Sequence, residues 1–165
     1  MLKIRKANES DLDSAYEIYK LAILEMYKNN INQWDNLYPN RDIIEDDILK
    51  NQLFLGEINR EIASVFVLNK EYDEEYNNMN WKYKDASFFI LHRLCVNTKF
   101  QNQGIGTKTM RLIEEFLKGE GIETIRVDAF SLNPFALKMY EKAGYSKVGE
   151  ANWWKGLFYL FEKLI

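Results

Sequence analysis

The stretch QNQGIGTKT, Gln101 to Thr109, carries two glycines one residue apart, after an apolar run and before a helical pattern. Glycines in such a turn let the main chain approach a ligand closely. The exposed N–H groups and the dipole of the following helix favour an anion, and Thr107 can add a hydroxyl. The pattern indicates a phosphate-binding turn. The alternative is a plain strand-to-helix turn whose glycines allow tight packing.

Two other phosphate-binding motifs fail on spacing. A dinucleotide fingerprint needs G-x-G-x-x-G, but Thr109 occupies the position of the third glycine. A P-loop needs a glycine five positions before its second one, and here that position is Gln101. The turn therefore belongs to neither class.

Composition narrows the class of protein. The 165 residues suit one domain, residues 1–165, and the net charge of −3 gives no general attraction for nucleic acid. One cysteine and one histidine exclude an internal disulfide and any metal site built from several such residues. The N-terminus lacks the apolar core of a signal peptide, and no apolar run is long enough to span a bilayer. We expect a cytoplasmic protein without metal, nucleic-acid or membrane partners, and its many Asn and Lys suggest a bacterial source.

Hydrophobic periodicity predicts strands alternating with helices. The run Ser87 to Val96 is apolar almost throughout and should be a central strand. The element order predicts an α/β (α+β) fold, a mixed sheet with helices on both faces. Strands are expected at 2–7, 52–58, 61–68, 87–96, 124–130, 145–150 and 157–165, and helices after a cap at Asn8 or Ser10, at about 41–50, at about 104–118 and from Pro134 to Gly144.

Two motifs resemble those of the GNAT superfamily of N-acetyltransferases. HRLCVNTKFQNQGIGTKTM, residues 92–110, is similar to its acetyl-CoA motif, Q/R-x-x-G-x-G/A after the central strand. NPFALKMYEKAGY, residues 133–145, resembles a later signature: an Asn, a helix bearing Tyr, then a Gly-aromatic turn. The resemblance implies a mostly antiparallel central sheet of about seven strands, splayed in the middle and flanked by about four helices.

The resemblance also implies acetyl-CoA as co-substrate. Strands 87–96 and 124–130 would part at their C-terminal ends, and the pantetheine arm would lie in the opening. Main-chain groups of one strand would bond to that arm, and N–H groups of the turn would hold the pyrophosphate. The implied cofactor-binding residues are Leu94, Cys95, Val96, Gln101, Asn102, Gln103, Gly104, Ile105, Gly106, Thr107, Asn133 and Tyr140.

Tyr140 is the candidate general acid. Forming an amide from a thioester requires a neutral amine, a stabilised oxyanion and a leaving thiolate. The resemblance places a tyrosine at this position beside the cofactor sulfur, where its phenol would donate to the departing thiolate. Without the resemblance, Tyr140 would be interpreted as a core residue, because it lies on an apolar stripe of its helix.

His92 is the candidate general base. Its ordinary pKa of about 6.5 suits proton transfer at neutral pH, and strand alternation would place His92, Leu94 and Val96 on one face. A buried histidine bonded to a backbone group is an equal alternative. Glu57 is a second candidate base, although a solvated residue at a strand end explains it as well.

Large aromatic residues are the candidates for acceptor binding. Trp34, Tyr38 and Trp81 could form the walls of an apolar or cationic acceptor pocket. Asp35 could hold an ammonium group. For Trp34 and Tyr38 the alternative is anchoring of a loop onto the core.

The sequence therefore predicts an acetyl-CoA-dependent N-acetyltransferase. It would move the acetyl group to a primary amine of a small molecule or peptide by direct attack in a ternary complex. The alternatives are an acetyl-CoA-binding sensor or interaction module without turnover, and an acyltransferase with a different acyl chain. A homodimer could form if the apolar strand at 157–165 paired across a sheet edge.

Overall fold

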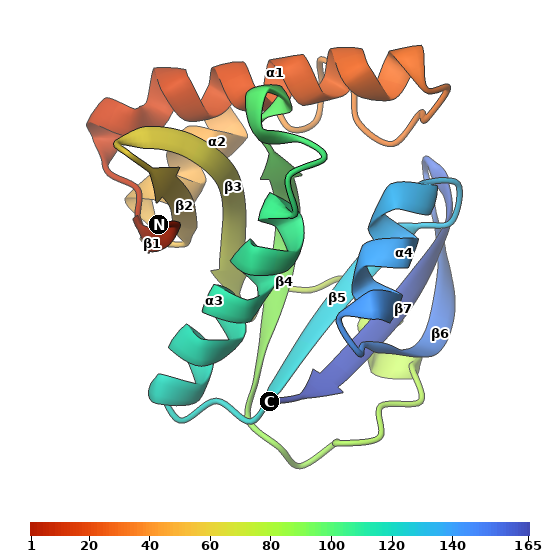
Figure 1. Cartoon of the computed structure of the whole chain (residues 1–165). Helices are drawn as coiled ribbons and strands as arrows, with labels where there is room; N and C mark the ends of the chain where they lie inside the picture. The colour runs from red at the N-terminus through yellow and green to blue at the C-terminus, as the bar shows by residue number, and fades with distance from the viewer. The chain divides into compact units, whose positions relative to one another are not determined.

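The structure is a computed structural model that describes residues 1–165 (Figure 1). Its seven strands form one sheet in the order β1-β2-β3-β4-β5-β7-β6. The predicted order of elements and the mixed, mostly antiparallel sheet are confirmed. The elements are β1 (Lys3–Lys6), α1 (Leu12–Lys28), α2 (Arg41–Leu49), β2 (Leu53–Ile58), β3 (Glu61–Asn69), β4 (Phe88–Val96), α3 (Ile105–Gly119), β5 (Thr124–Phe130), α4 (Pro134–Lys142), β6 (Ser146–Trp153) and β7 (Gly156–Leu164).

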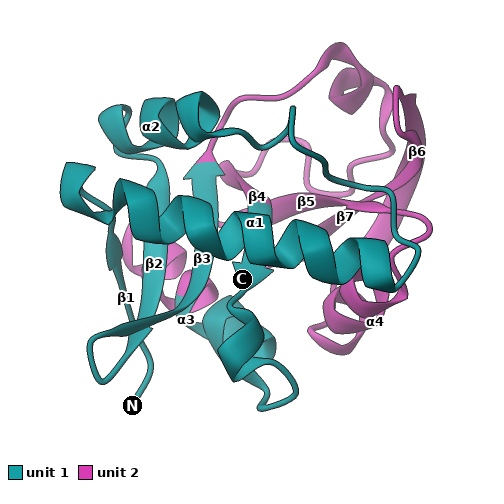
Figure 2. Ribbon diagram, turned by 90° about the horizontal axis from the view of Figure 1, so that it is seen from above, with its two compact units in different colours: residues 1–68, 93–112 teal, residues 69–92, 113–165 magenta.

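The chain divides into two compact units, shown in teal and magenta in Figure 2. Unit 1 contains residues 1–68 and 93–112, and unit 2 contains residues 69–92 and 113–165. Strand β4 and helix α3 each begin in one unit and end in the other. The expectation of a single domain over residues 1–165 stays a prediction.

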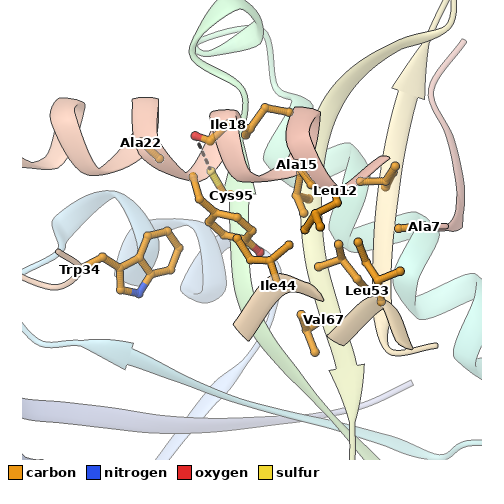
Figure 3. Close-up of a cluster of buried hydrophobic side chains, with 14 of the residues drawn as sticks. Ala7, Leu12, Ala15, Ile18, Ala22, Trp34, Ile44, Leu53, Val67 and Cys95 are labelled. Atoms are coloured by element: carbon orange, nitrogen blue, oxygen red, sulfur yellow. Dashed lines mark hydrogen bonds between the residues drawn. The ribbon is translucent and has the colours of Figure 1, made fainter. Parts of the chain in front are cut away.

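In unit 1, helices α1 and α2 pack on the antiparallel strands β1, β2 and β3. The turn between β2 and β3 holds Asn59 and Arg60 with φ of 51° and 69°. Two successive residues in the left-handed region are typical of a tight hairpin turn, which the sequence predicted at this place. The buried core of the unit, part of which appears in Figure 3, consists of Ala7, Leu12, Ala15, Ile18, Tyr19, Ala22, Ile23, Trp34, Ile44, Ile48, Leu53, Leu55, Val65, Val67 and Cys95.

In unit 2, strand β7 lies between β5 and β6 and pairs antiparallel with both. The expectation that residues 157–165 pair across a sheet edge is therefore wrong, because both edges of this strand are already used. An apolar run of this kind is typical of an internal strand. Strand β4 joins the unit by parallel pairing, from Phe88 opposite Thr124 to Leu91 opposite Val127.

Residues 70–87 connect β3 to β4 and lie on the sheet of unit 2. Tyr76 and Trp81 of this connection are buried together with Ile90, Ala151 and Leu160. The Trp81 indole N–H donates to the Tyr76 carbonyl at 2.6 Å. The connection is thus fixed in place by aromatic packing.

Arg93, in the middle of β4, has a left-handed backbone with φ of 49°. Its guanidinium forms a buried ion pair with Asp47 of α2 and donates to the Tyr38 hydroxyl at 2.8 Å. The Tyr19 hydroxyl of α1 donates to the Arg93 carbonyl at 2.8 Å. Both helices and the loop between them therefore hold this residue.

Replacing Asp47 should destabilise the protein strongly. In Asp47→Ala the Arg93 charge stays buried without its carboxylate, which costs about 3–5 kcal/mol. The matched control is Asp46→Ala, since Asp46 forms an exposed i,i+4 pair with Lys50, a class of pair worth about 0.3–0.5 kcal/mol. Urea denaturation measures the free energy of unfolding of both variants. Equal losses of this free energy in the two variants would contradict the role given to Asp47.

Candidate active site

The glycine turn begins where Asn97 ties the end of β4 to β3. The Asn97 main-chain N–H donates to the Ala63 carbonyl at 2.9 Å, and its side-chain amide donates to the Ile62 carbonyl at 2.8 Å. Its side-chain oxygen accepts from the Lys99 N–H at 3.1 Å. The chain therefore leaves the strand in a fixed direction.

Gly104 adopts the left-handed conformation that its residue type favours, with φ of 72°. The first helical bond of α3 runs from the Lys108 N–H to the Gly104 carbonyl at 3.0 Å. The N–H groups of Ile105, Gly106 and Thr107 precede that bond and have no acceptor within the helix. A Cβ added to Gly104 would meet nothing within 4 Å. The predicted turn thus offers unpaired helical donors next to open space, which fits a phosphate.

The end of β4 carries the three residues predicted to lie along the pantetheine arm. Leu94 and Val96 are half-buried, and Cys95 is buried among the core of unit 1. The Cys95 Sγ lies 3.9 Å from the Ile18 carbonyl oxygen (Figure 3). Burial raises the pKa of the Cys95 thiol to about 12, so the side chain is a neutral packing group. Its main chain remains the part proposed to bind a ligand.

Tyr140 lies on α4, whose start is fixed by two residues that the sequence indicated. The Asn133 side-chain oxygen accepts from the Ala136 N–H at 3.2 Å, and Pro134 occupies the first turn. Tyr140 is 5% exposed, and its ring packs 5.8 Å from that of Tyr145. Burial, and after it the negative charge of Asp128, raise the pKa of Tyr140. The phenol therefore holds its proton at neutral pH.

His92 is half-buried and is bonded to a side chain of unit 2. Its Nε2 lies 2.8 Å from the Oδ1 of Asn69. Because an amide oxygen only accepts, Nε2 carries the hydrogen, and a neutral ring then has its lone pair on Nδ1. The partner of Nε2 is thus a side chain, and the alternative of a histidine bonded to a backbone group stays a prediction. Left-handed Arg93 also interrupts the alternation of β4, so a common face for His92, Leu94 and Val96 no longer follows from spacing.

The aromatic residues predicted for the acceptor have structural contacts of their own. Trp34 is 5% exposed and packs edge-on against Tyr19 with ring centroids 5.6 Å apart. The Tyr38 hydroxyl accepts from Arg93. Trp81 is buried, and the Arg126 guanidinium stacks 4.2 Å from its ring. The structure gives all three the anchoring role, and their acceptor role stays a prediction.

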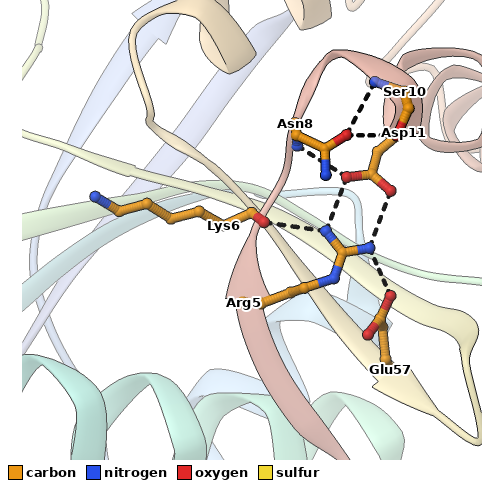
Figure 4. A network of polar contacts seen from close by, with 6 residues as sticks. All are labelled: Arg5, Lys6, Asn8, Ser10, Asp11 and Glu57. Atoms are coloured by element: carbon orange, nitrogen blue, oxygen red, sulfur yellow. Dashed lines mark hydrogen bonds and ion pairs between the residues drawn. The ribbon is translucent and has the colours of Figure 1, made fainter.

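Glu57, the second candidate base, belongs to a network of charged groups in unit 1 (Figure 4). The Arg5 guanidinium donates to Glu57 at 2.6 Å and to the two carboxylate oxygens of Asp11 at 2.8 and 2.9 Å. Glu57 also lines a cavity of about 650 Å³ between the start of α1 and the β2–β3 hairpin. An ion-paired carboxylate is the weaker candidate for proton abstraction.

Residues 15–145 match the family model described as the acetyltransferase (GNAT) family. The chain belongs to this family. Over 138 residues it is 29% identical to YesJ of Bacillus subtilis (strain 168), an uncharacterized N-acetyltransferase, and this alignment covers 81% of the chain and 74% of that protein. The resemblance predicted from the two motifs is thus confirmed, and the chain is an enzyme of the acetyltransferase class.

Solved structures share the GNAT fold. An acetyltransferase of Streptococcus agalactiae 2603 superposes with a TM-score of 0.88 at 22% identity, over 99% of this chain and 95% of that one. The aminoglycoside acetyltransferase AAC(6')-Ib in complex with coenzyme A superposes with a TM-score of 0.71 at 19% identity, over 99% of this chain and 95% of that one.

Two further observations concern membrane-spanning helices and metal-ligating side chains in this GNAT chain. None of its helices combines the length and apolar character required to cross a membrane. No group of three or more histidine, cysteine or carboxylate side chains is gathered where it could hold a metal ion.

Sequence reasoning missed two polar pairs of this GNAT protein. They are the Arg93–Asp47 ion pair in unit 1 and the hydrogen bond from the Tyr76 hydroxyl to Asp128 in unit 2. The signal for both was a charged residue inside an apolar strand, Arg93 in FFILHRLCV and Asp128 in TIRVDAF. Charges placed there need partners from other elements.

The buried tyrosines should resist ionisation until the protein unfolds. Burial is the largest cause that raises the pKa of Tyr19, Tyr76, Tyr140 and Tyr145. A folded pKa above the unfolded value of about 10 gives stability that is present below pH 10 and lost as the pH rises through the folded pKa. Absorbance titration should show these four of the ten tyrosines ionising together with the loss of circular dichroism. Ionisation of all ten in a folded protein would contradict this.

Proposed function

We propose that this chain transfers the acetyl group of acetyl-CoA to a primary amine of a small molecule or peptide, by direct attack in a ternary complex. The observation that carries the proposal is the open turn before α3, where left-handed Gly104 faces free space beside unpaired N–H groups. Family membership and the coenzyme A complex of a structural neighbour support it.

Two segments of unit 1 would hold acetyl-CoA, which supplies an acetyl thioester when bound. The N–H groups from Gln101 to Thr107 are proposed for the pyrophosphate, because residues 102–104 are exposed and the turn lies at the positive end of α3. Among them, the Gln101 N–H also donates to the Thr98 carbonyl at 3.3 Å. The main chain from Leu94 to Val96 would bond to the pantetheine arm. By family resemblance, Asn133 would contact the same arm.

Tyr140 would supply the proton that the sulfur needs when the carbon–sulfur bond breaks. A donor must be protonated at neutral pH, and the burial of Tyr140 ensures this. The phenol is also held by two aromatic neighbours, with its ring 5.8 Å from Tyr145 and 6.1 Å from Phe161. Its hydroxyl thus has a defined position and a proton to give.

His92 would take a proton from the acceptor nitrogen, directly or through water. Its bond to Asn69 fixes the ring and directs the lone pair to Nδ1. Glu57 is less suited as the base, because its carboxylate is paired with Arg5.

We further propose a cytoplasmic location and a single-domain bacterial enzyme, on the basis of composition and of the bacterial relatives.

Acetyl-CoA should raise the melting temperature, whereas NAD and ATP should not. At 100 times its Kd a ligand adds about 2.7 kcal/mol, which corresponds to about 5–10 °C for a chain of this size. Differential scanning fluorimetry with each ligand measures the shift. Absence of a shift with acetyl-CoA would refute the proposed function.

Gly104→Asp should abolish that shift, because it adds a side chain and a negative charge to the phosphate cradle. Gly121→Asp is the matched control, since Gly121 has a similar φ of 76° and equally open surroundings. Each substitution should cost about 1–2 kcal/mol of backbone strain, but only the first should prevent binding. Normal acetyl-CoA affinity in Gly104→Asp would reject the assignment of the turn.

Tyr140→Phe should lower kcat by about 10²–10⁴-fold while acetyl-CoA binding stays nearly intact, since general acid catalysis contributes factors of this size. Tyr145→Phe is the control, because it removes a hydroxyl from the neighbouring ring in the same aromatic cluster. Thiol release from acetyl-CoA across a panel of amines, polyamines, amino acids, aminoglycosides and peptides gives the rates. Equal turnover in the two variants would remove Tyr140 from the mechanism.

A further inference from the structure

Three consecutive residues of β3 hold both ends of the glycine turn. At the start of the turn, Asn97 donates from its side chain to the Ile62 carbonyl and from its main chain to the Ala63 carbonyl. At its end, the hydroxyls of Ser64 and Thr109 share a hydrogen bond of 2.9 Å. All of these residues belong to unit 1. The strand therefore fixes both the point where the turn leaves the sheet and the point where the following helix returns to it.

Ser64 lies on the face of β3 that is turned away from α1 and α2. Its neighbour Val65 packs in the core beneath those two helices, and successive side chains of a strand point to opposite faces. Gly56 of β2 is paired opposite Ser64. A Cβ added to Gly56 would come within 2.2 Å of the Ser64 Oγ. The missing side chain at Gly56 thus leaves the space that the Ser64 hydroxyl occupies.

The pairing of β2 with β3 is irregular at the same place. Gly56 is paired with Ser64 and Glu57 with Ile62, so that Ala63 is an extra residue on β3. A bulge of this kind bends a strand and changes the direction of its groups. Here the Ala63 carbonyl accepts from the Asn97 N–H at 2.9 Å. The bulge therefore serves the bond that fixes the start of the turn.

Thr109 is a polar residue on the buried face of α3. It is fully buried and lies one helical turn after Ile105, which is also buried. A buried hydroxyl costs desolvation unless it is hydrogen-bonded, and a valine would fill the same volume without that cost. The hydroxyl of Thr109 therefore contributes direction, because it joins the helix to one atom of β3.

This bond lies next to the groups proposed for the phosphate. The unpaired N–H groups of Ile105, Gly106 and Thr107 belong to the first turn of the helix that Thr109 attaches to the sheet. A helix is rigid over one turn, so fixing Thr109 also fixes these donors. Donors that are already in place bind an anion more tightly, because no ordering has to occur on binding.

We propose that Ser64 and Thr109 are positioning residues for the pyrophosphate of acetyl-CoA. Their bond holds the start of α3 against β3 and so sets the N–H donors of the glycine turn before the ligand arrives. Both residues are fully buried, so they act through the helix and not by contact with the ligand. This inference rests on the proposed function and adds to it the contact that gives the binding turn its shape.

Two substitutions of Thr109 separate positioning from packing. Thr109→Val keeps the volume and removes the hydroxyl, whereas Thr109→Ser keeps the hydroxyl and leaves the space of a methyl group in the core. The Kd for acetyl-CoA is measured by isothermal titration calorimetry, at a temperature where circular dichroism shows every variant to be folded. The Kd for S-acetylpantetheine, which lacks the pyrophosphate, is measured by displacement.

Thr109→Val should raise the Kd for acetyl-CoA about 2- to 12-fold, the equivalent of one net hydrogen bond. Its Kd for S-acetylpantetheine should stay at the wild-type value, and Thr109→Ser should bind both ligands as the wild type does. The double variant Ser64→Ala/Thr109→Val leaves no hydroxyl unpaired. It should melt at a higher temperature than Thr109→Val and still show the same loss of acetyl-CoA affinity.

The matched control is Val65→Ala, which weakens the same strand on its other face. It should lower the melting temperature without changing either Kd. The proposal is overturned if Thr109→Val binds acetyl-CoA as the wild type does, if it weakens both ligands equally, or if Thr109→Ser loses as much affinity as Thr109→Val. If the wild type does not bind acetyl-CoA, the proposed function itself has failed, so the two failures are distinguishable.

Discussion

The left-handed backbone of Arg93 is the constraint on which the candidate site depends. Such a conformation costs a non-glycine residue about 1–2 kcal/mol, and here α1, α2 and the loop between them offset it through Tyr19, Asp47 and Tyr38. The residue lies where β4 passes from one unit to the other. Before it, the strand pairs with β5 and carries His92; after it, the strand leads to the glycine turn. The buried Arg93–Asp47 ion pair thus holds the strand at the point between His92 and the residues that lead to the glycine turn.

The two units carry different parts of the proposed chemistry. Unit 1 contains the groups suited to hold a nucleotide-like cofactor, which are main-chain donors and need no special pKa. Unit 2 contains the two side chains proposed for proton transfer, His92 and Tyr140, and the ring of Tyr140 lies among buried aromatic rings. Main-chain recognition depends on backbone geometry, whereas proton transfer depends on burial. Unit 1 supplies the backbone geometry that main-chain recognition needs, and unit 2 supplies the burial that keeps the Tyr140 phenol protonated.

The sequence was sufficient for the elements and for the turn, because these depend on local rules. Asn8 and Asn133 are N-caps, Asn59 and Arg60 make a hairpin turn, and Gly104 is left-handed. The sequence was insufficient to predict contacts between segments that are distant along the chain. The internal position of β7 follows from strand order, which alternation does not encode. Asp128 was recognisable as an acid in an apolar strand, but its partner Tyr76 lies 52 residues away along the chain. Likewise, the burial of Trp34 and Trp81 depends on tertiary packing.

The chain passes between its two units after Leu68, after His92 and after Leu112. Two of these passages occur inside unbroken elements, β4 and α3. Neither unit is therefore one continuous length of polypeptide, and no single cut in the gene separates them. Exchange of one block of sequence with a relative therefore replaces a part of one unit or parts of both, but never one complete unit by itself. A complete unit of a relative cannot be imported as a single continuous segment.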